Sequence, residues 1–293
     1  MIQNPLFYCK NKDTYPPFKN GYYMEEHFMN YISQNNVKTK RKYIPALWTN
    51  FQIEPWFKIK KNEMQNALNT WVSENQCDEG YYTIVQYDDG PLLELPPNTI
   101  IYGACSGHIP LPLIYEDRKH TLETFKKKQF SDKKILCSFV GNITSNYVQP
   151  NVRNALFQKF LNNKHFVMIN SGGWTANVQV DKQQLFIDTT INSKFALAPR
   201  GYGRSSFRFF ECFQLGTIPV YVWNDQEWLP YKNIIDYNKF CISIHVSQLN
   251  ELCDILLSID KNQYMKMFEE YNKIKHIFTL NGMSQFIISN VNG

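Results

Sequence analysis

The segment Ala196–Val222 holds the most distinctive chemistry of the chain. It reads ALAPRGYGRSSFRFFECFQLGTIPVYV, so an apolar run stops at Pro199 and two glycines follow within four residues. The glycine spacing is neither that of a P-loop nor G-x-G-x-x-G. Charge-assisted hydrogen bonds from arginine favour phosphate groups, and three arginines lie close together here, namely Arg200, Arg204 and Arg208. The segment therefore predicts a site for a phosphate or diphosphate.

A helix is expected directly after this loop. Ser205 or Ser206 is a good N-cap, and Gly216 suits the left-handed position after the last helical residue. The helix N-terminus then lies at the carboxyl end of a strand, where open α/β sheets bind ligands and where the helix dipole favours an anion. Glu211 lies one to two turns into this helix and can reach a ribose diol, which indicates a nucleoside diphosphate. The alternative for Glu211 is an ion pair with Arg208.

Apolar strands alternate with helices through the second half of the chain. We expect strands at 135–141, 165–173, 194–201 and 217–223, and helices at 149–163, 181–193, 205–216 and 245–259. Such alternation is typical of βαβ units and a parallel sheet. The first half is less regular, with a helix that stops near Asn35 and β-rich stretches at 41–49, 80–91 and 98–106. The sequence thus predicts an α/β fold with two domains that face each other across a cleft.

A charged stretch separates the two halves. Residues 118–133 have few apolar side chains and are interpreted as the linker. We therefore expect an N-terminal domain over residues 1–130 and a C-terminal domain over 131–293, with the option that the last helix packs back on the N-terminal domain.

Several matched positions resemble a known family. The segment FALAPRGYGRSSFRFFECFQLGTIPV, together with CSFVGN…VRNALF from Cys137 to Phe157, is similar to the C-terminal signature of the exostosin family, glycosyltransferase family 47. That signature is apolar-Pro-Arg-Gly, a short loop, Ser-Phe-Arg, then Glu and Gly-x-x-Pro-Val. The resemblance covers roughly residues 134–225. Asn/Lys-rich composition without a membrane anchor looks most like the short soluble members encoded by large algal viruses.

The resemblance implies a GT-B architecture, with two Rossmann-like domains, and an inverting transfer from a nucleotide sugar. UDP-xylose is the first expectation for the donor, and the acceptor would be an oligosaccharide or a glycoprotein glycan. Arg153 and Arg200 would contact the diphosphate, and Glu211 would hold the ribose. The full nucleotide-sugar site carried over is Gly141, Asn142, Arg153, Arg200, Gly201, Gly203, Arg204, Ser205, Ser206, Arg208 and Glu211.

No metal cofactor is expected, so the UDP-sugar is a co-substrate only. The sequence has no Asp-x-Asp and no His/Cys cluster with metal-ligand spacing. Arginines and a helix dipole can stabilise the departing diphosphate instead.

An inverting transfer needs a group that deprotonates the acceptor hydroxyl. Asp88 and Asp89 follow a strand in the N-terminal half, and we favour Asp89 as the base, although turn formation is the simplest role of both. His108 is the second candidate. Glu25 and its neighbours on the early helix are expected to form a solvated face, with acceptor contact as the alternative.

Composition limits the remaining function classes. The formal net charge is +5, from 31 basic and 26 acidic residues that are scattered along the chain, which excludes a nucleic-acid footprint. Seven single cysteines indicate reduced thiols, and no segment reaches the ~20 apolar residues of a membrane span. We expect a soluble cytoplasmic protein with no nucleic-acid or membrane partner. A non-catalytic nucleotide- or glycan-binding protein of the same fold is the alternative to an enzyme.

Overall fold

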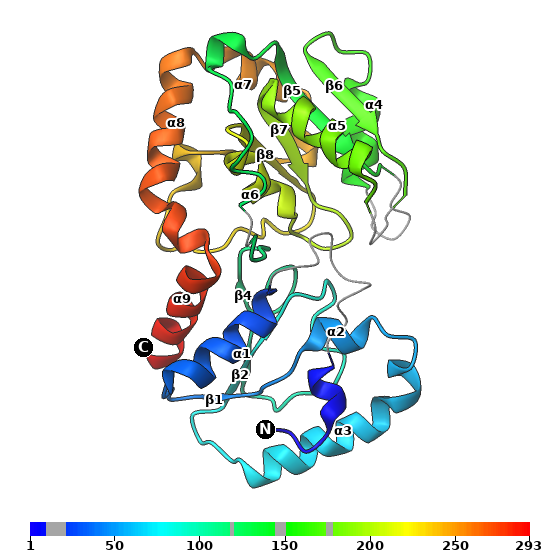
Figure 1. Ribbon diagram of the computed structural model, residues 1–293, viewed down its shortest axis with the longest axis vertical. Coiled ribbons are helices and arrows are strands. Elements are labelled where there is room, and N and C mark those ends of the chain that lie inside the picture. Colours follow the sequence, from blue (N-terminus) through cyan, green and yellow to red (C-terminus); the bar gives the residue numbers. More distant parts are fainter. Residues whose placement is uncertain (10–21, 118–119, 144–150, 174–177) are drawn as a thin grey trace. The chain divides into compact units, whose positions relative to one another are not determined.

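The computed structural model describes residues 1–9, 22–117, 120–143, 151–173 and 178–293. Contacts divide the chain into two units (Figure 1). Unit 1 comprises Met1–Glu116 and Ile277–Gly293, and unit 2 comprises Asp117–His276. The boundary predicted from the sequence, between residues 130 and 131, lies further along the chain than the observed one at Glu116–Asp117. Residues 130 and 131 belong to the segment that leads into the first strand of unit 2.

Unit 1 is built on a four-stranded parallel sheet. Its strands are β1 (Lys42–Tyr43), β2 (Tyr81–Val85), β3 (Thr99–Gly103) and β4 (Ile109–Pro110), in the spatial order β1-β2-β3-β4. All five residues of β2 are buried, as expected for a strand that has neighbours on both sides and is covered on both faces. The carboxyl ends of these strands share one edge of the sheet.

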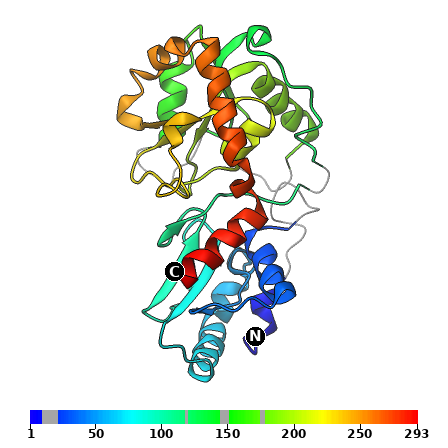
Figure 2. The ribbon, with the colours of Figure 1, turned by 90° about the vertical axis from the view of Figure 1, so that its left-hand side faces the viewer.

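Among the described residues of unit 1, the α-helices that accompany this sheet are α1 (Met24–Asn35), α2 (Trp48–Gln52), α3 (Phe57–Glu74) and α9 (Leu280–Asn292). Helix α2 is anchored to the core because the Trp48 indole N–H donates to Thr83 Oγ1 of β2 at 2.7 Å. The C-terminal helix α9 contacts α1 within unit 1 and lies beside it in both views (Figures 1 and 2). The last helix of the chain therefore belongs to the N-terminal fold.

Unit 2 is built on a five-stranded parallel sheet. Its strands are β5 (Ile135–Gly141), β6 (Phe166–Asn170), β7 (Ser193–Pro199), β8 (Ile218–Trp223) and β9 (Ile242–His245), in the order β6-β5-β7-β8-β9. The helices are α4 (Val152–Phe160), α5 (Val180–Ile191), α6 (Phe207–Gln214), α7 (Leu252–Ser258) and α8 (Lys261–Ile274). Counted along unit 2, the strand order is 2-1-3-4-5, one of the two common doubly wound arrangements.

Buried apolar side chains from the strands of unit 2 pack against α4, α7 and α8. Phe139, Phe195, Leu197 and Val220 supply the strand side of this core. A buried lysine, Lys133, lies at the amino end of the sheet and donates to Ile191 O, Ser193 O and Thr217 Oγ1.

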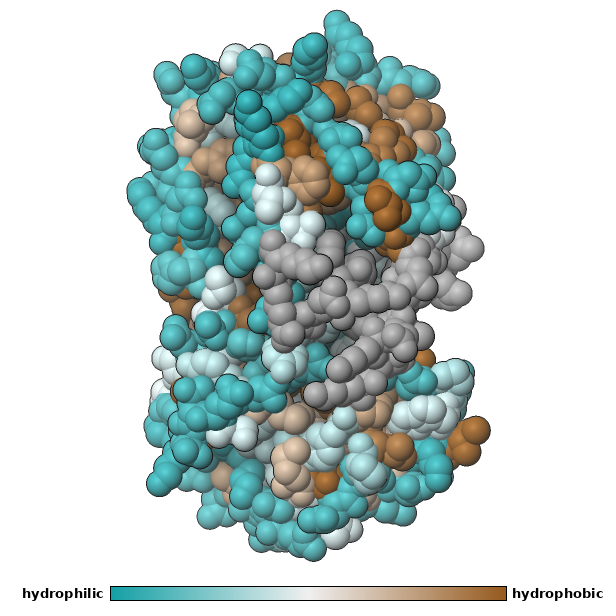
Figure 3. Space-filling model, in the orientation of Figure 1, coloured by the Kyte–Doolittle hydropathy of each residue, from teal (hydrophilic) through white to brown (hydrophobic). Residues whose placement is uncertain are grey.

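Both units are thus Rossmann-like, and the expected α/β class with two parallel sheets is confirmed. On the face shown in Figure 3, hydrophilic residues predominate and hydrophobic ones surface in small groups. No helix within the described ranges is both long and apolar enough to cross a bilayer.

Candidate functional site

The strand order of unit 2 points to a candidate ligand site between β5 and β7. The chain turns to opposite sides of the sheet after these two neighbouring strands, and doubly wound folds bind ligands outside the carboxyl ends at such a point. Gly141 ends β5 and Asn142 follows it, whereas Pro199 ends β7 and Arg200 follows it. Most residues of the expected nucleotide-sugar site therefore lie at this one edge of the sheet.

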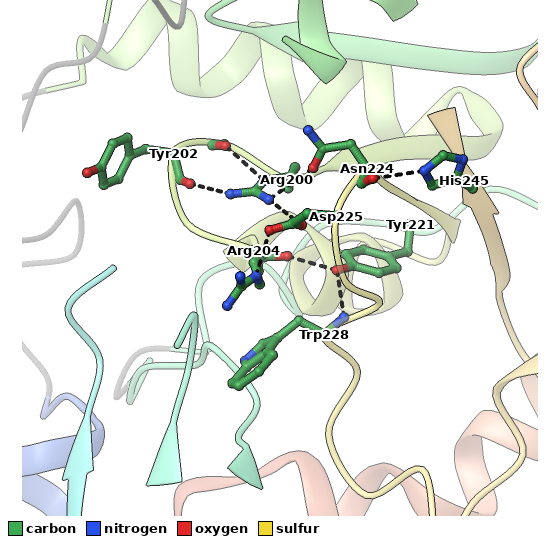
Figure 4. Close-up of polar contacts among 9 residues, drawn as sticks. Arg200, Tyr202, Arg204, Tyr221, Asn224, Asp225, Trp228 and His245 are labelled. Carbon is green, nitrogen blue, oxygen red and sulfur yellow. Dashed lines mark hydrogen bonds and ion pairs between the residues drawn. The ribbon is translucent and has the colours of Figure 1, made fainter. Parts of the chain in front are cut away.

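Arg200 uses its whole guanidinium group to brace the surrounding loops (Figure 4). Nε donates to Gly201 O at 3.4 Å, and Nη2 donates to Tyr202 O at 2.7 Å. Nη1 donates to Asn224 Oδ1 at 3.0 Å and to Asp225 Oδ1 at 2.5 Å. Because its side chain is only 7% exposed, Arg200 fixes the loop after β7 against the loop after β8.

Asp225 belongs to the same network of contacts and was not predicted from the sequence. Its carboxylate pairs with both Arg200 and Arg204, and the Arg204 Nε distance is 2.9 Å. Burial opposes ionisation, but the Gln226 backbone N–H and the two arginines outweigh it and hold the pKa of Asp225 at about 2. Asp225 is thus a permanent anion that orients both arginines. Its position two residues after an apolar strand of a parallel sheet was the sequence feature that could have indicated a role for Asp225 at this edge.

The loop after β7 is held from below by aromatic residues (Figure 4). The Arg204 guanidinium lies 5.5 Å from the centre of the Trp228 ring, and its side chain remains 31% exposed. Tyr221 Oη donates to Arg204 O at 2.9 Å and accepts the backbone N–H of Trp228 at 3.1 Å. Next to Asp225, Asn224 O accepts a hydrogen bond from His245 Nε2 at 2.8 Å. These contacts tie the loop after β7 to β8 and to the loop that follows β8.

Arg153 connects the two strand ends at the switch point. Its Nη1 donates to Asn142 O and its Nε donates to Arg200 O, each at 3.2 Å. A Cβ at position 201 would lie 2.9 Å from Arg153 Nη2, so Gly201 makes room for this guanidinium. The structure therefore brings Asn142, Arg153 and Arg200 together, as the sequence predicted for the site.

Arg208 presents a cation without a hydrogen-bond partner at Nη1 among the described residues. It is the second residue of α6, and its Nη1 atom is inaccessible to solvent. The guanidinium carbon lies 5.0 Å from the ring of Phe139 and 5.5 Å from that of Phe186. A Cβ at position 141 would lie 2.4 Å from Nη2, so only glycine leaves space for Arg208 at the end of β5.

Burial lowers the pKa of Arg208, and the Glu211 carboxylate three residues further along α6 opposes this effect. A buried cation with an unsatisfied donor is costly. An anionic ligand at the switch point would supply the missing acceptor.

The start of α6 offers further donors for an anion. Ser206 is the N-cap with extended backbone, and its side chain makes no cap hydrogen bond within the helix. The first N–H groups of α6 therefore have no side-chain cap, and the helix dipole adds a partial positive charge there. Ser205 is half-buried and Gly203 is buried in the loop before this helix. At the other end, Gly216 takes the expected left-handed conformation, with φ of +73°.

The base candidates of the first half lie at the carboxyl edge of the unit 1 sheet. Asp88 and Asp89 are both exposed in a turn that directly follows β2, closed by a bond from Gly90 N to Tyr87 O at 3.0 Å. His108 lies after β3, and its Nδ1 accepts the Ile101 N–H at 2.9 Å. This bond leaves the neutral His108 ring with its proton on Nε2.

The expectation of a solvated face at Glu25 is wrong. Its side chain is only 2% exposed because the N-terminal end of α1 packs onto the end of β2 and onto α2. Within the described ranges, no group of three or more histidine, cysteine, aspartate or glutamate side chains is arranged to hold a metal ion.

Comparison with known proteins matches the sequence of this chain to a family model. The exostosin GT47 domain matches residues 106–259, more than half of the chain and including both strand ends at the switch point. A probable glycosyltransferase of Arabidopsis thaliana, At5g03795, is 26% identical over 151 residues, which are 52% of this chain and 27% of that protein.

The exostosin-1 homolog of Caenorhabditis elegans is 24% identical over 274 residues, covering 83% of this chain and 65% of its own length. Drosophila melanogaster exostosin-1 is 29% identical over 170 residues, or 52% of this chain and 22% of that protein. The chain thus spans less than two thirds of each of these relatives. With the domain match over more than half of its length, it belongs to the exostosin GT47 family.

Proposed function

We propose that the protein is an inverting glycosyltransferase that moves a sugar from a UDP-sugar to a glycan hydroxyl without a metal ion. Membership of the exostosin GT47 family supports glycosyl transfer. The observation that carries the donor site is Arg208, a cation held at an uncapped helix start with an unsatisfied buried nitrogen. A diphosphate supplies the acceptor oxygen that this nitrogen lacks, and the dipole of α6 favours its negative charge.

The arginines of unit 2 divide into two roles in this proposal. Arg208 binds the diphosphate directly, together with the first N–H groups of α6. Arg200 acts one step away, because its donors are engaged with loop carbonyls, Asn224 and Asp225. Arg153 fixes the strand ends on which the diphosphate rests. Glu211 then takes the ribose diol, further along the same helix.

Preorganised cations can do the work of a metal ion here. When the glycosidic bond to the donor breaks, negative charge develops on the departing UDP. Arg208 and the N-terminus of α6 are already directed at the switch point, so they stabilise this charge without reorganisation. Arg204, which is partly exposed and held by Asp225, is placed to add a second cation.

An exposed carboxylate of unit 1 completes the reaction. Asp89, with Asp88 as its neighbour, removes the proton of the acceptor hydroxyl as that oxygen attacks the anomeric carbon from the side opposite UDP. His108 is less suited, since its Nδ1 lone pair already accepts the Ile101 N–H. Xylose is our first choice of sugar, through the resemblance to the short viral members of the family. An oligosaccharide or a glycoprotein glycan is the acceptor class.

The direct test is a panel of UDP-sugars presented to the purified chain in the presence of EDTA. Saturation-transfer NMR reports binding, and release of UDP with and without glycan acceptors reports transfer. We expect UDP-xylose to bind and turn over without added metal. Activity only with Mg²⁺ or Mn²⁺ would contradict the metal-free mechanism. Binding without turnover for every sugar and acceptor would instead favour a non-catalytic nucleotide-binding protein.

A further inference from the structure

Buried polar side chains surround the turn that carries Asp88 and Asp89. Gly90 closes the turn with a φ of +78°, and a Cβ at this position would lie 3.0 Å from Ser106 Oγ in the loop after β3. The tip of the turn is exposed, whereas Gln86 before it and Gly90 at its end are buried. An exposed pair of carboxylates is thus mounted on a base that is fixed inside unit 1.

Glu25 holds the first side of this turn. Its Oε1 accepts the backbone N–H of Gln86 at 2.7 Å and the hydroxyl of Thr49 at 2.7 Å. Its Oε2 accepts the Thr49 N–H at 3.0 Å. One buried carboxylate therefore ties together α1, α2 and the residue that directly follows β2.

Gln52 holds the second side of the turn. Its Nε2 donates to Gly90 O at 3.0 Å, and its Oε1 accepts the Leu92 N–H at 2.6 Å. The side chain is 6% exposed and lies three residues after Thr49, on the next turn of α2. Both sides of the turn are therefore attached to the same short helix through buried hydrogen bonds.

Burial of a carboxyl group is costly to the fold, because an ionisable group loses its hydration in the interior. A buried carboxyl group can still be useful if it positions a catalytic group, since a displacement of about 1 Å can lower the rate a hundredfold. We propose that Glu25 and Gln52 form a clamp that positions the Asp88–Asp89 turn for deprotonation of the acceptor. Glu25 acts as a positioning residue in this clamp. The inference rests on the proposed transferase function.

The protonation state of Glu25 sets how well the clamp holds. Burial raises the pKa of Glu25 to about 7, against the hydrogen bonds from Gln86 and Thr49, and the neighbouring Glu26 raises it further. The titratable groups that face Glu25 among the described residues are Glu26 on α1 and Tyr43 on β1. Below the pKa, a carboxyl proton competes with the three donors that point at Glu25. Transfer should therefore fall as the pH drops below about 7.

The experiment compares variants of the clamp in the intact protein. Glu25→Gln places an amide N–H₂ where two backbone N–H groups need acceptors, and Gln52→Ala removes the second side. Gln65→Ala is the matched control for Gln52, because Gln65 also brackets a backbone segment, at Glu94, with one donated and one accepted bond. Thr49→Val removes the hydroxyl donor to Glu25, and Thr49→Ser keeps it. For each variant, kcat is measured from pH 5 to 9 together with the Kd of UDP.

We expect Glu25→Gln and Gln52→Ala to lower kcat about tenfold or more and to leave the Kd of UDP within about twofold. Gln65→Ala should match the wild type. In the wild type, the acidic limb of the kcat–pH profile lies near pH 7. This limb should move to higher pH in Thr49→Val, and it should move less in Thr49→Ser. It should disappear in Glu25→Gln. Unchanged kcat and an unchanged limb in Glu25→Gln would overturn the clamp. A wild-type protein that transfers no sugar would overturn the proposed function instead.

Discussion

Arginines predominate at the carboxyl edge of the unit 2 sheet, where Asp225 pairs with two of them, whereas carboxylates gather at the carboxyl edge of the unit 1 sheet. At the edge of unit 2, Arg153, Arg200 and Arg208 follow strand ends or begin helices. At the edge of unit 1, the corresponding positions hold Glu25, Asp88 and Asp89. The same scaffold therefore presents cations in one unit, suited to a diphosphate, and carboxylates in the other, suited to a proton. In both units, buried polar groups hold the turn or loop next to the proposed site residues.

The largest expected effect tests the unit 1 edge. Asp89→Asn should lower transfer by about 10²–10⁴-fold, the range for a lost general base, because the amide cannot take the acceptor proton. UDP binding should not change, since we assign the donor site to unit 2. Transfer rate and UDP affinity are measured side by side with Asp88→Asn and His108→Ala. If only His108→Ala lost turnover, the general base would be the His108 imidazole and not a carboxylate.

A second comparison concerns one buried ionisable group in each unit. The pKa of Glu25 is raised from 4.5 to about 7, so its contribution to stability is present below pH 4.5 and is lost between about 4.5 and 7. Relative to Glu25→Gln, the wild-type free energy of unfolding should fall by up to about 3 kcal/mol across that window. Denaturant titrations at pH 5 and 7 measure this difference, and a pH-independent difference would refute the shift.

Lys133 in unit 2 should show the opposite slope. Burial lowers the pKa of Lys133 from 10.5 to about 8, although nearby Cys212 opposes the effect. The native state then binds fewer protons than the unfolded state between pH 8 and 10.5, so stability rises through this window. Relative to Lys133→Met, the wild type should gain up to about 3 kcal/mol. Denaturant titrations of the wild type and of Lys133→Met at pH 8 and 10 measure this difference. A wild type that loses stability over this range would contradict the lowered pKa.

The sequence predicted unit 2 more completely than unit 1, for physical reasons. Three strands of unit 2, β5, β7 and β8, are largely apolar runs that end at Gly141, Pro199 and Trp223, and a helix or a loop separates each strand of this unit from the next. In unit 1, β1 and β4 have two residues each, too few for a pattern. Helix α3 does bury Phe57, Met64, Leu68 and Trp71 at helical spacing. No helix was predicted there, although this spacing indicates one.

The site could be predicted where its chemistry is local. Arg200, Ser206 and Arg208 lie within one segment, so their proximity follows from the sequence. Asp225 and Glu25 contact residues that are more than 20 positions away in the sequence and that only the fold brings close. Their partners therefore cannot be predicted from the local sequence. Glu25 also sits on a polar stretch of α1, where charge normally indicates solvent, and only packing onto α2 and β2 buries it.

The smallest expected effect separates the parts of the donor. Glu211→Ala should weaken UDP binding about tenfold, the value of a hydrogen bond to a charged group, if its carboxylate holds the ribose diol. Affinity for inorganic diphosphate should remain within about twofold. Calorimetric titrations with the two ligands give the comparison. Equal losses for both would mean that Glu211 acts through Arg208.

The most direct test of the donor site is the affinity of UDP for Arg208→Met, titrated calorimetrically in EDTA. Methionine keeps the apolar contacts with Phe139 and Phe186 but removes the charge. Arg41→Met serves as the control, because Arg41 lies in unit 1 and donates to Asn98 O. We predict that Arg208→Met weakens UDP binding by about tenfold or more, while Arg41→Met binds like the wild type. Wild-type affinity in Arg208→Met would contradict the assignment of the diphosphate to the switch point of unit 2.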